Sequence, residues 1–179
     1  MYAITSLLNP RNAKRITRIV KGLETKFGLD DVQATPDPHL TYLLISTRRL
    51  VDLKELLQEV ASTTQPFSAY TSGLGVFPGE NPVIYVPVLR SNNLNELHQR
   101  VLDVTAPLCR APSYYCPDRW LPHLSLALHD TTPDLLGPVL RHLNAETYNL
   151  HLNVNNIAIL RKKGDLFVRE EVFELTGKP

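Results

Sequence analysis

The residues of this chain that are best suited to chemistry are two histidines in a repeated motif. The pattern Pro-His-Leu-(Thr/Ser) occurs twice, with His39 and Thr41 in the first copy and His123 and Ser125 in the second. Each copy opens an apolar run that is typical of a β-strand. Because side chains alternate between the faces of a strand, each histidine shares a face with the hydroxyl two residues later. The motif therefore predicts two matching imidazole–hydroxyl pairs.

Two such pairs supply the groups that cleavage of a phosphodiester requires. One neutral imidazole accepts the proton of the attacking oxygen, and a second, protonated imidazole gives a proton to the leaving oxygen. The ordinary histidine pKa of about 6.5 suits both roles. The hydroxyls can donate hydrogen bonds to the non-bridging oxygens. We therefore predict that His39, Thr41, His123 and Ser125 are catalytic, with no metal and no cofactor.

A structural role is the alternative explanation for these residues. A single His-x-Thr on a strand is common by chance and usually structural. Two copies, each preceded by proline and each at the start of an apolar strand, are less easily explained by chance, so the pattern favours catalysis.

Hydrophobic periodicity predicts the elements that position the motifs. Strands are expected at 2–8, 39–46, 67–76, 83–89, 121–129, 148–160 and 166–175. Helices are expected at 12–27, 52–61, 93–108 and 133–143. The same order of elements thus occurs twice, with the motifs on equivalent strands, which indicates an internal duplication.

This order of elements predicts an α+β fold of two pseudo-symmetric lobes. Each lobe is expected to be an antiparallel sheet with helices outside, and the two sheets face a central cleft. We expect one bilobal domain over residues 1–179, with pseudo-repeats at about 1–80 and 81–179.

The charge of the chain limits the kind of nucleic acid that it can bind. Nineteen Lys and Arg residues against eighteen Asp and Glu leave a formal net charge of +1. Strong sequence-independent binding to a nucleic acid needs many clustered cationic contacts. A nucleic-acid substrate would therefore be short or held by a local basic patch.

The cysteines and the N-terminus indicate the cellular setting. Cys109 and Cys116 form no CxxC motif, and their number and spacing do not indicate a disulfide framework or a zinc site. The N-terminus has neither the charged start of a signal peptide nor an apolar run long enough for a membrane span. We expect a soluble, cytoplasmic monomer that does not bind membranes.

The paired motifs resemble those of the two-histidine (2H) phosphoesterase superfamily, and within it the RNA 2',3'-cyclic phosphodiesterases, also called 2'-5' RNA ligases. A second match is the segment Gly-Leu-Gly-Val-Phe-Pro at 73–78, which is similar to the family's Gly-x-Phe-Pro turn between the motifs. The resemblance implies hydrolysis of 2',3'-cyclic phosphate ends of RNA or nucleotides without a metal, typically leaving a 2'-phosphate. It also implies that some members join RNA halves reversibly through a 2'-5' bond.

Candidate substrate contacts lie outside the motifs. Family members often carry an arginine soon after the second motif, whereas this chain has Leu-Ala-Leu-His at 126–129. A cationic contact to the RNA end or nucleotide would then come from Arg48, Arg119 or Arg161. Phe77, in the turn beside the expected cleft, is the candidate for stacking on a base.

Two alternatives remain open at this point. The protein could cleave 2'-5' oligonucleotides or another small cyclic phosphate by the same chemistry. It could instead be a non-catalytic RNA- or nucleotide-binding module. The intact pairs favour an enzyme, because binding alone does not need a symmetric acid and base.

Overall fold

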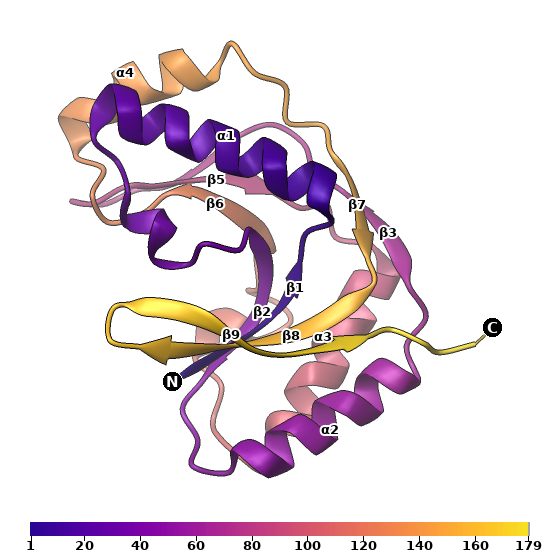
Figure 1. Ribbon diagram of the computed structural model, residues 1–179. Helices are drawn as coiled ribbons and strands as arrows, with labels where there is room; N and C mark the ends of the chain where they lie inside the picture. The colour runs from indigo at the N-terminus through magenta and orange to yellow at the C-terminus, as the bar shows by residue number, and fades with distance from the viewer. Residues whose placement is uncertain (179) are drawn as a thin grey trace.

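The computed structural model describes residues 1–178 as two lobes, each a sheet covered by helices (Figure 1). The first sheet has the strand order β2-β1-β8-β9, and the second has the order β4-β5-β6. The strands of the first sheet are β1 (Tyr2–Leu7), β2 (His39–Ile45), β8 (Asn156–Lys163) and β9 (Leu166–Glu174). Those of the second are β4 (Gly75–Phe77), β5 (Val83–Pro87) and β6 (His123–Ala127). A separate pair is β3 (Phe67–Tyr70) and β7 (His151–Val154). All of these pairings are antiparallel, as the sequence predicted.

Two of the helices pack against the sheet of the opposite lobe, and the other two stay with their own. They are α1 (Pro10–Phe27), α2 (Leu50–Ser62), α3 (Asn92–Thr105) and α4 (Pro133–Leu143), with short 3-10 turns η1 (Asp31–Ala34) and η2 (Ser113–Tyr115). Helix α1 follows β1 but packs against β6, and α3 follows β5 but packs against β2. Helices α2 and α4 remain with the lobe of the strand that precedes them (Figure 1). Each lobe therefore contains segments from both halves of the chain.

Local sequence explains how α1, the longest helix, begins and ends. The side chain of Asn9 accepts a hydrogen bond from the backbone nitrogen of Asn12 at 3.0 Å, and Pro10 occupies the first turn. Gly28 ends the helix in the left-handed region with a φ of 73°, which glycine adopts without a steric penalty. The apolar stripe of the helix is buried, and its polar face is left to solvent.

Two expected strands are each divided into two. Residues 67–76 form β3 and β4, separated by a turn in which Gly73 has a φ of 69°. Residues 148–160 contain the end-to-end strands β7 and β8, which belong to different sheets. Periodicity does not reveal such a change, because each half has the composition of a strand and only the partner strand differs.

None of the helices in residues 1–178 combines the length and the hydropathy that a bilayer span requires.

Candidate active site

The two motif histidines occupy equivalent positions in the two sheets. His39 is the first residue of β2 and pairs with Leu7 at the end of β1. His123 is the first residue of β6 and pairs with Pro87 at the end of β5. The chain thus places each imidazole at the same end of a hydrogen-bonded strand pair, once in each lobe.

The strand irregularities beside the histidines are also equivalent. The β1–β2 register shifts between Ile4 and Thr5, and the β5–β6 register shifts between Ile84 and Tyr85. Both shifts leave an extra residue three positions after the histidine, so that two consecutive residues of each motif strand are buried. Up to that point the expected alternation holds, and the histidine and the hydroxyl share a half-buried face.

The hydrogen bonds of the two imidazoles match as well. Nδ1 of His39 lies 2.7 Å from the carbonyl oxygen of Asp37, and Nδ1 of His123 lies 2.7 Å from that of Leu121. A carbonyl oxygen only accepts, so Nδ1 carries the proton in both rings. This leaves each Nε2, the nitrogen on the far side of the ring, as the atom that can take up or release a proton.

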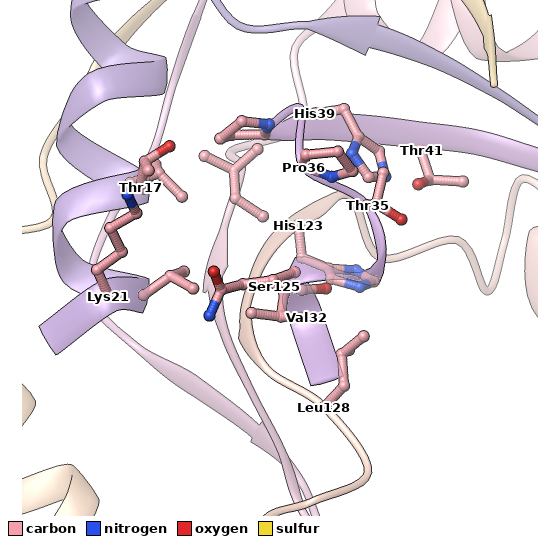
Figure 2. Close-up of a pocket in the computed structure, with 15 residues that line it drawn as sticks. Thr17, Lys21, Val32, Thr35, Pro36, His39, Thr41, His123, Ser125 and Leu128 are labelled. Atoms are coloured by element: carbon pink, nitrogen blue, oxygen red, sulfur yellow. The ribbon is translucent and has the colours of Figure 1, made fainter. Parts of the chain in front are cut away.

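Both imidazoles line one cavity of about 370 Å³. Figure 2 shows His39 and His123 approaching the same space from β2 and β6, together with Thr41 and Ser125. The structure therefore brings all four predicted catalytic side chains together. Helix α1 and η1 complete the wall with apolar side chains and a few polar ones, among them Lys21.

The surroundings of the two rings favour their neutral forms. Burial is the main cause that lowers the pKa of His39, and the nearby charge of a protonated His123 lowers it further. The Asp37 carbonyl and carboxylate oppose this effect. Burial also lowers the pKa of His123, against the Leu121 carbonyl. A negatively charged ligand between the rings would favour protonation of one of them.

An aromatic wall stands beside His123. Phe77 meets the His123 ring edge-on at a centroid distance of 5.3 Å, and Tyr85 lies 5.1 Å from it. Phe77 and Tyr85 stack on each other at 4.3 Å. A side chain at Gly75 would collide with the Tyr85 ring, so this wall requires a glycine there. Phe77 therefore lies beside His123, at the end of β4 rather than in the turn, and it does not line the cavity. It is 36% exposed, and its role in substrate binding stays a prediction.

The arginines considered as phosphate contacts lie elsewhere. Neither Arg48 nor Arg119 lines the cavity. Arg48 follows the far end of β2, Arg119 is an exposed neighbour of Asp118, and Arg161 lies 3.7 Å from Glu170. A role for Arg48 and Arg119 in substrate binding stays a prediction. The cation in the cavity wall is Lys21, which sequence reasoning missed because only the packing of α1 against β6 brings it there.

The carboxylates that could together hold a metal ion do not line the cavity. Among residues 1–178, the only cluster of three potential ligands is Asp30, Asp31 and Asp130. One oxygen of Asp130 already accepts hydrogen bonds from the backbone nitrogens of Asp30 and Asp31, at 2.6 and 2.9 Å. Through these bonds Asp130 holds the loop that follows α1, and the cluster contains no motif side chain.

A family model describes both the motifs and the fold. The model of the 2'-5' RNA ligase superfamily matches residues 8–166. The chain belongs to this superfamily. Membership confirms the resemblance to the two-histidine phosphoesterases that the motifs indicated. A search of curated protein sequences found no significant match.

Solved structures of this type share the two-lobed fold over almost their whole length. The TT0787 protein of Thermus thermophilus is 18% identical, with a TM-score of 0.70 and 99% of each chain covered. A structure described as a phosphoesterase is 12% identical, with a TM-score of 0.62, covering 98% of this chain and 97% of that one. LigT of E. coli complexed with 3'-AMP is 13% identical, with a TM-score of 0.59 and the same coverage. At these identities the likeness establishes the fold.

Proposed function

We propose that the protein hydrolyses 2',3'-cyclic phosphates at the ends of RNA or of nucleotides, without a metal. The observation that carries the proposal is the pair of imidazoles on one cavity, each held through Nδ1 by a backbone carbonyl. In this arrangement both Nε2 atoms are free for proton transfer at the same phosphate.

The reaction follows from these positions. Water attacks phosphorus, and one neutral imidazole takes its proton at Nε2. The bond from phosphorus to one ribose oxygen breaks, and the other imidazole, protonated, supplies the proton that this oxygen needs. The hydroxyls of Thr41 and Ser125 donate to the non-bridging oxygens, where negative charge grows. At the end of the reaction the first imidazole is protonated and the second is neutral. Proton exchange with solvent restores the starting states. If the 5'-hydroxyl of a second RNA takes the place of water, one imidazole accepts its proton, the bond from phosphorus to the 3'-oxygen breaks, and the other imidazole protonates that oxygen. The same groups would then join RNA ends through a 2'-5' bond.

Two further observations support a nucleotide substrate. The cavity volume of about 370 Å³ is in the range of small-ligand sites. LigT, which shares the fold, has been crystallised with 3'-AMP and with phosphate. By analogy, the phosphate would lie between the imidazoles, and the exposed part of Phe77 would contact a base.

The test is a panel of substrates assayed with EDTA present. The panel contains the four 2',3'-cyclic mononucleotides, an oligoribonucleotide with a cyclic phosphate end, and 2'-5' oligoadenylate. We expect turnover of at least one cyclic substrate, reduced by about 10²-fold or more in His39→Ala and in His123→Ala. His129→Ala is the matched control, because His129 is exposed and lies outside the cavity.

Three results would contradict the proposal. Turnover that survives both substitutions would remove the histidines from the mechanism. Turnover that disappears with EDTA alone would require a metal. Cleavage of 2'-5' oligoadenylate only would favour the alternative substrate class.

A further inference from the structure

The positive charge of this protein is concentrated on one helix. The sequence of α1 contains six lysine or arginine residues and one glutamate, in a chain whose formal net charge is +1. The basic residues are Arg11, Lys14, Arg15, Arg18, Lys21 and Lys26. The rest of the molecule is therefore net negative, and a near-neutral total conceals a local basic surface of the kind that binds a phosphate backbone.

Part of this surface forms a ridge that begins at the active-site cavity. Lys14, Arg18 and Lys21 are exposed, and their spacing places them on one side of the helix. Lys21 also lines the cavity with the two histidines (Figure 2), so the cavity and the ridge meet at this residue. From Lys21 to Lys14 the ridge extends about 10 Å along the helix.

A second hollow lies at the other end of the ridge. A groove of about 670 Å³ is lined by Arg11, Lys14, Arg18 and His151, among others. The His151 ring stacks on Tyr70 with a centroid distance of 5.1 Å and an interplanar angle of 14°. Tyr70 is 54% exposed, which leaves an aromatic surface beside a cationic groove. Single-stranded nucleic acids bind to this combination of charge and stacking surface.

Few of the basic residues of α1 are engaged in ion pairs, so their charge is available to bind a ligand. Arg18 contacts Glu146 at 3.1 Å, but the Arg18 side chain is 66% exposed and that of Glu146 36%, so solvent weakens the pair. Arg11, Lys14 and Lys21 have no salt-bridge partner among residues 1–178.

The carboxylates of Asp30, Asp31 and Asp130 lie just beyond the opposite, C-terminal end of α1. They repel a polyanion at that end. The electrostatic potential along α1 therefore favours a nucleic-acid strand that leaves the cavity towards Lys14 and Arg11.

We propose that α1 binds the RNA strand adjoining the reactive end, with phosphates along Lys21, Arg18 and Lys14 and a base on the Tyr70–His151 stack. This inference rests on the proposed function for the identity of the reactive end. It deepens that function, because it selects an extended RNA strand over a free cyclic nucleotide as the substrate that is bound best.

The test compares a long and a short substrate. Wild type and the double variant Arg11→Glu/Lys14→Glu are assayed with 2',3'-cyclic AMP and with an oligoribonucleotide that ends in a cyclic phosphate. Binding of a fluorescent oligoribonucleotide with a 3'-phosphate is measured separately by anisotropy. The control is Arg110→Glu/Lys162→Glu, which changes the net charge equally at exposed residues outside both hollows.

We expect the α1 variant to lose about tenfold in kcat/KM and in affinity for the oligomer at low salt, with cyclic AMP turnover within about twofold of wild type. The slope of log Kd against log salt should fall by about one or slightly more. Tyr70→Ala should weaken oligomer binding without changing cyclic AMP turnover, since it removes the stacking surface.

Several outcomes would overturn the inference. Unchanged oligomer binding in the α1 variant would do so, as would an equal loss in the control. Competition by polyglutamate as strong as that by RNA would point to an acidic protein segment instead. A failure of the proposed function would look different. The wild type would then turn over neither cyclic substrate, while the anisotropy assay would still measure oligoribonucleotide binding to α1.

Discussion

The indole nitrogen of Trp120 donates a hydrogen bond to the backbone carbonyl of Thr41 over 3.2 Å. Trp120 precedes β6 and Thr41 lies within β2, so this bond joins β2 to the segment that leads into β6. The Trp120 ring is 3% exposed and stacks on His98 at 3.8 Å. The next residue, Leu121, supplies the carbonyl that holds His123. Trp120 is therefore placed to fix the spacing of the two imidazoles.

Replacing Trp120 by phenylalanine should lower kcat while the protein stays folded. Phe keeps an aromatic ring in the core but removes the bond to Thr41, at a stability cost of about 1 kcal/mol. A small displacement of one catalytic strand should reduce kcat by about tenfold or more and change KM little. Tyr148→Phe is the control, because it removes a 2.9 Å hydrogen bond to Leu143, and neither residue lines the cavity. Equal kcat losses in both variants would show that Trp120 acts only through stability.

The hydroxyls of Thr41 and Ser125 should contribute to the transition state more than to binding. Thr41→Val and Ser125→Ala each remove a donor to oxygens whose charge increases during the reaction. We expect each variant to lose about 10²-fold in kcat with a smaller change in KM. Thr41→Ser retains the hydroxyl and should retain most of the activity. Steady-state kinetics on a cyclic mononucleotide measures this, and unchanged kcat in both donor-less variants would exclude the role.

The pKa of His39 should respond in opposite directions to two neighbouring substitutions. The Asp37 carboxylate favours the charged imidazole, and Arg169 binds that carboxylate at 2.6 and 3.2 Å. Asp37→Asn should lower the pKa of His39, because the attraction is lost. Arg169→Gln should raise it, because the carboxylate is no longer neutralised.

An NMR titration of the histidine side chains measures both shifts. The pKa of His123 serves as the internal control, since Asp37 is not among the groups that shift it. Shifts of the same sign in the two variants would contradict this account.

The buried His98 should make stability depend on pH. Its side chain is fully buried, and its pKa is lowered to about 4, mainly by burial and then by the charge of Arg90. Between that value and about 6.5, the unfolded chain binds a proton that the folded chain does not. The free energy of unfolding should therefore fall as the pH decreases through this window, by up to about 1.4 kcal/mol per pH unit from this residue.

His98→Phe keeps a ring against Trp120 and removes the titrating group. His39 and His123 also have lowered pKa values and contribute with the same sign, so the informative quantity is the difference from wild type. Urea denaturation at pH 7 and pH 5 should show a smaller loss of stability in the variant. Identical losses in both proteins would mean that His98 is not responsible.

Much of the site could be predicted because its information is local. His39 and Thr41, like His123 and Ser125, are two residues apart on a strand, and strand geometry alone places each pair on one face. The helix boundaries near Asn9 and Gly28 follow from capping residues in the same way. The split of residues 67–76 and 148–160 was missed, because each half of these segments resembles a strand and the choice of partner is not local.

Sequence by itself determined which side chains pair within each motif and which face of each element is apolar. Only the tertiary structure decided that α1 crosses to β6, that Lys21 reaches the cavity, and that Trp120 bonds to Thr41. The physical reason is that periodicity and capping depend on neighbours a few residues apart. Which surfaces meet depends instead on the burial of apolar area across the whole chain, and this brings residues that are distant in sequence to one site.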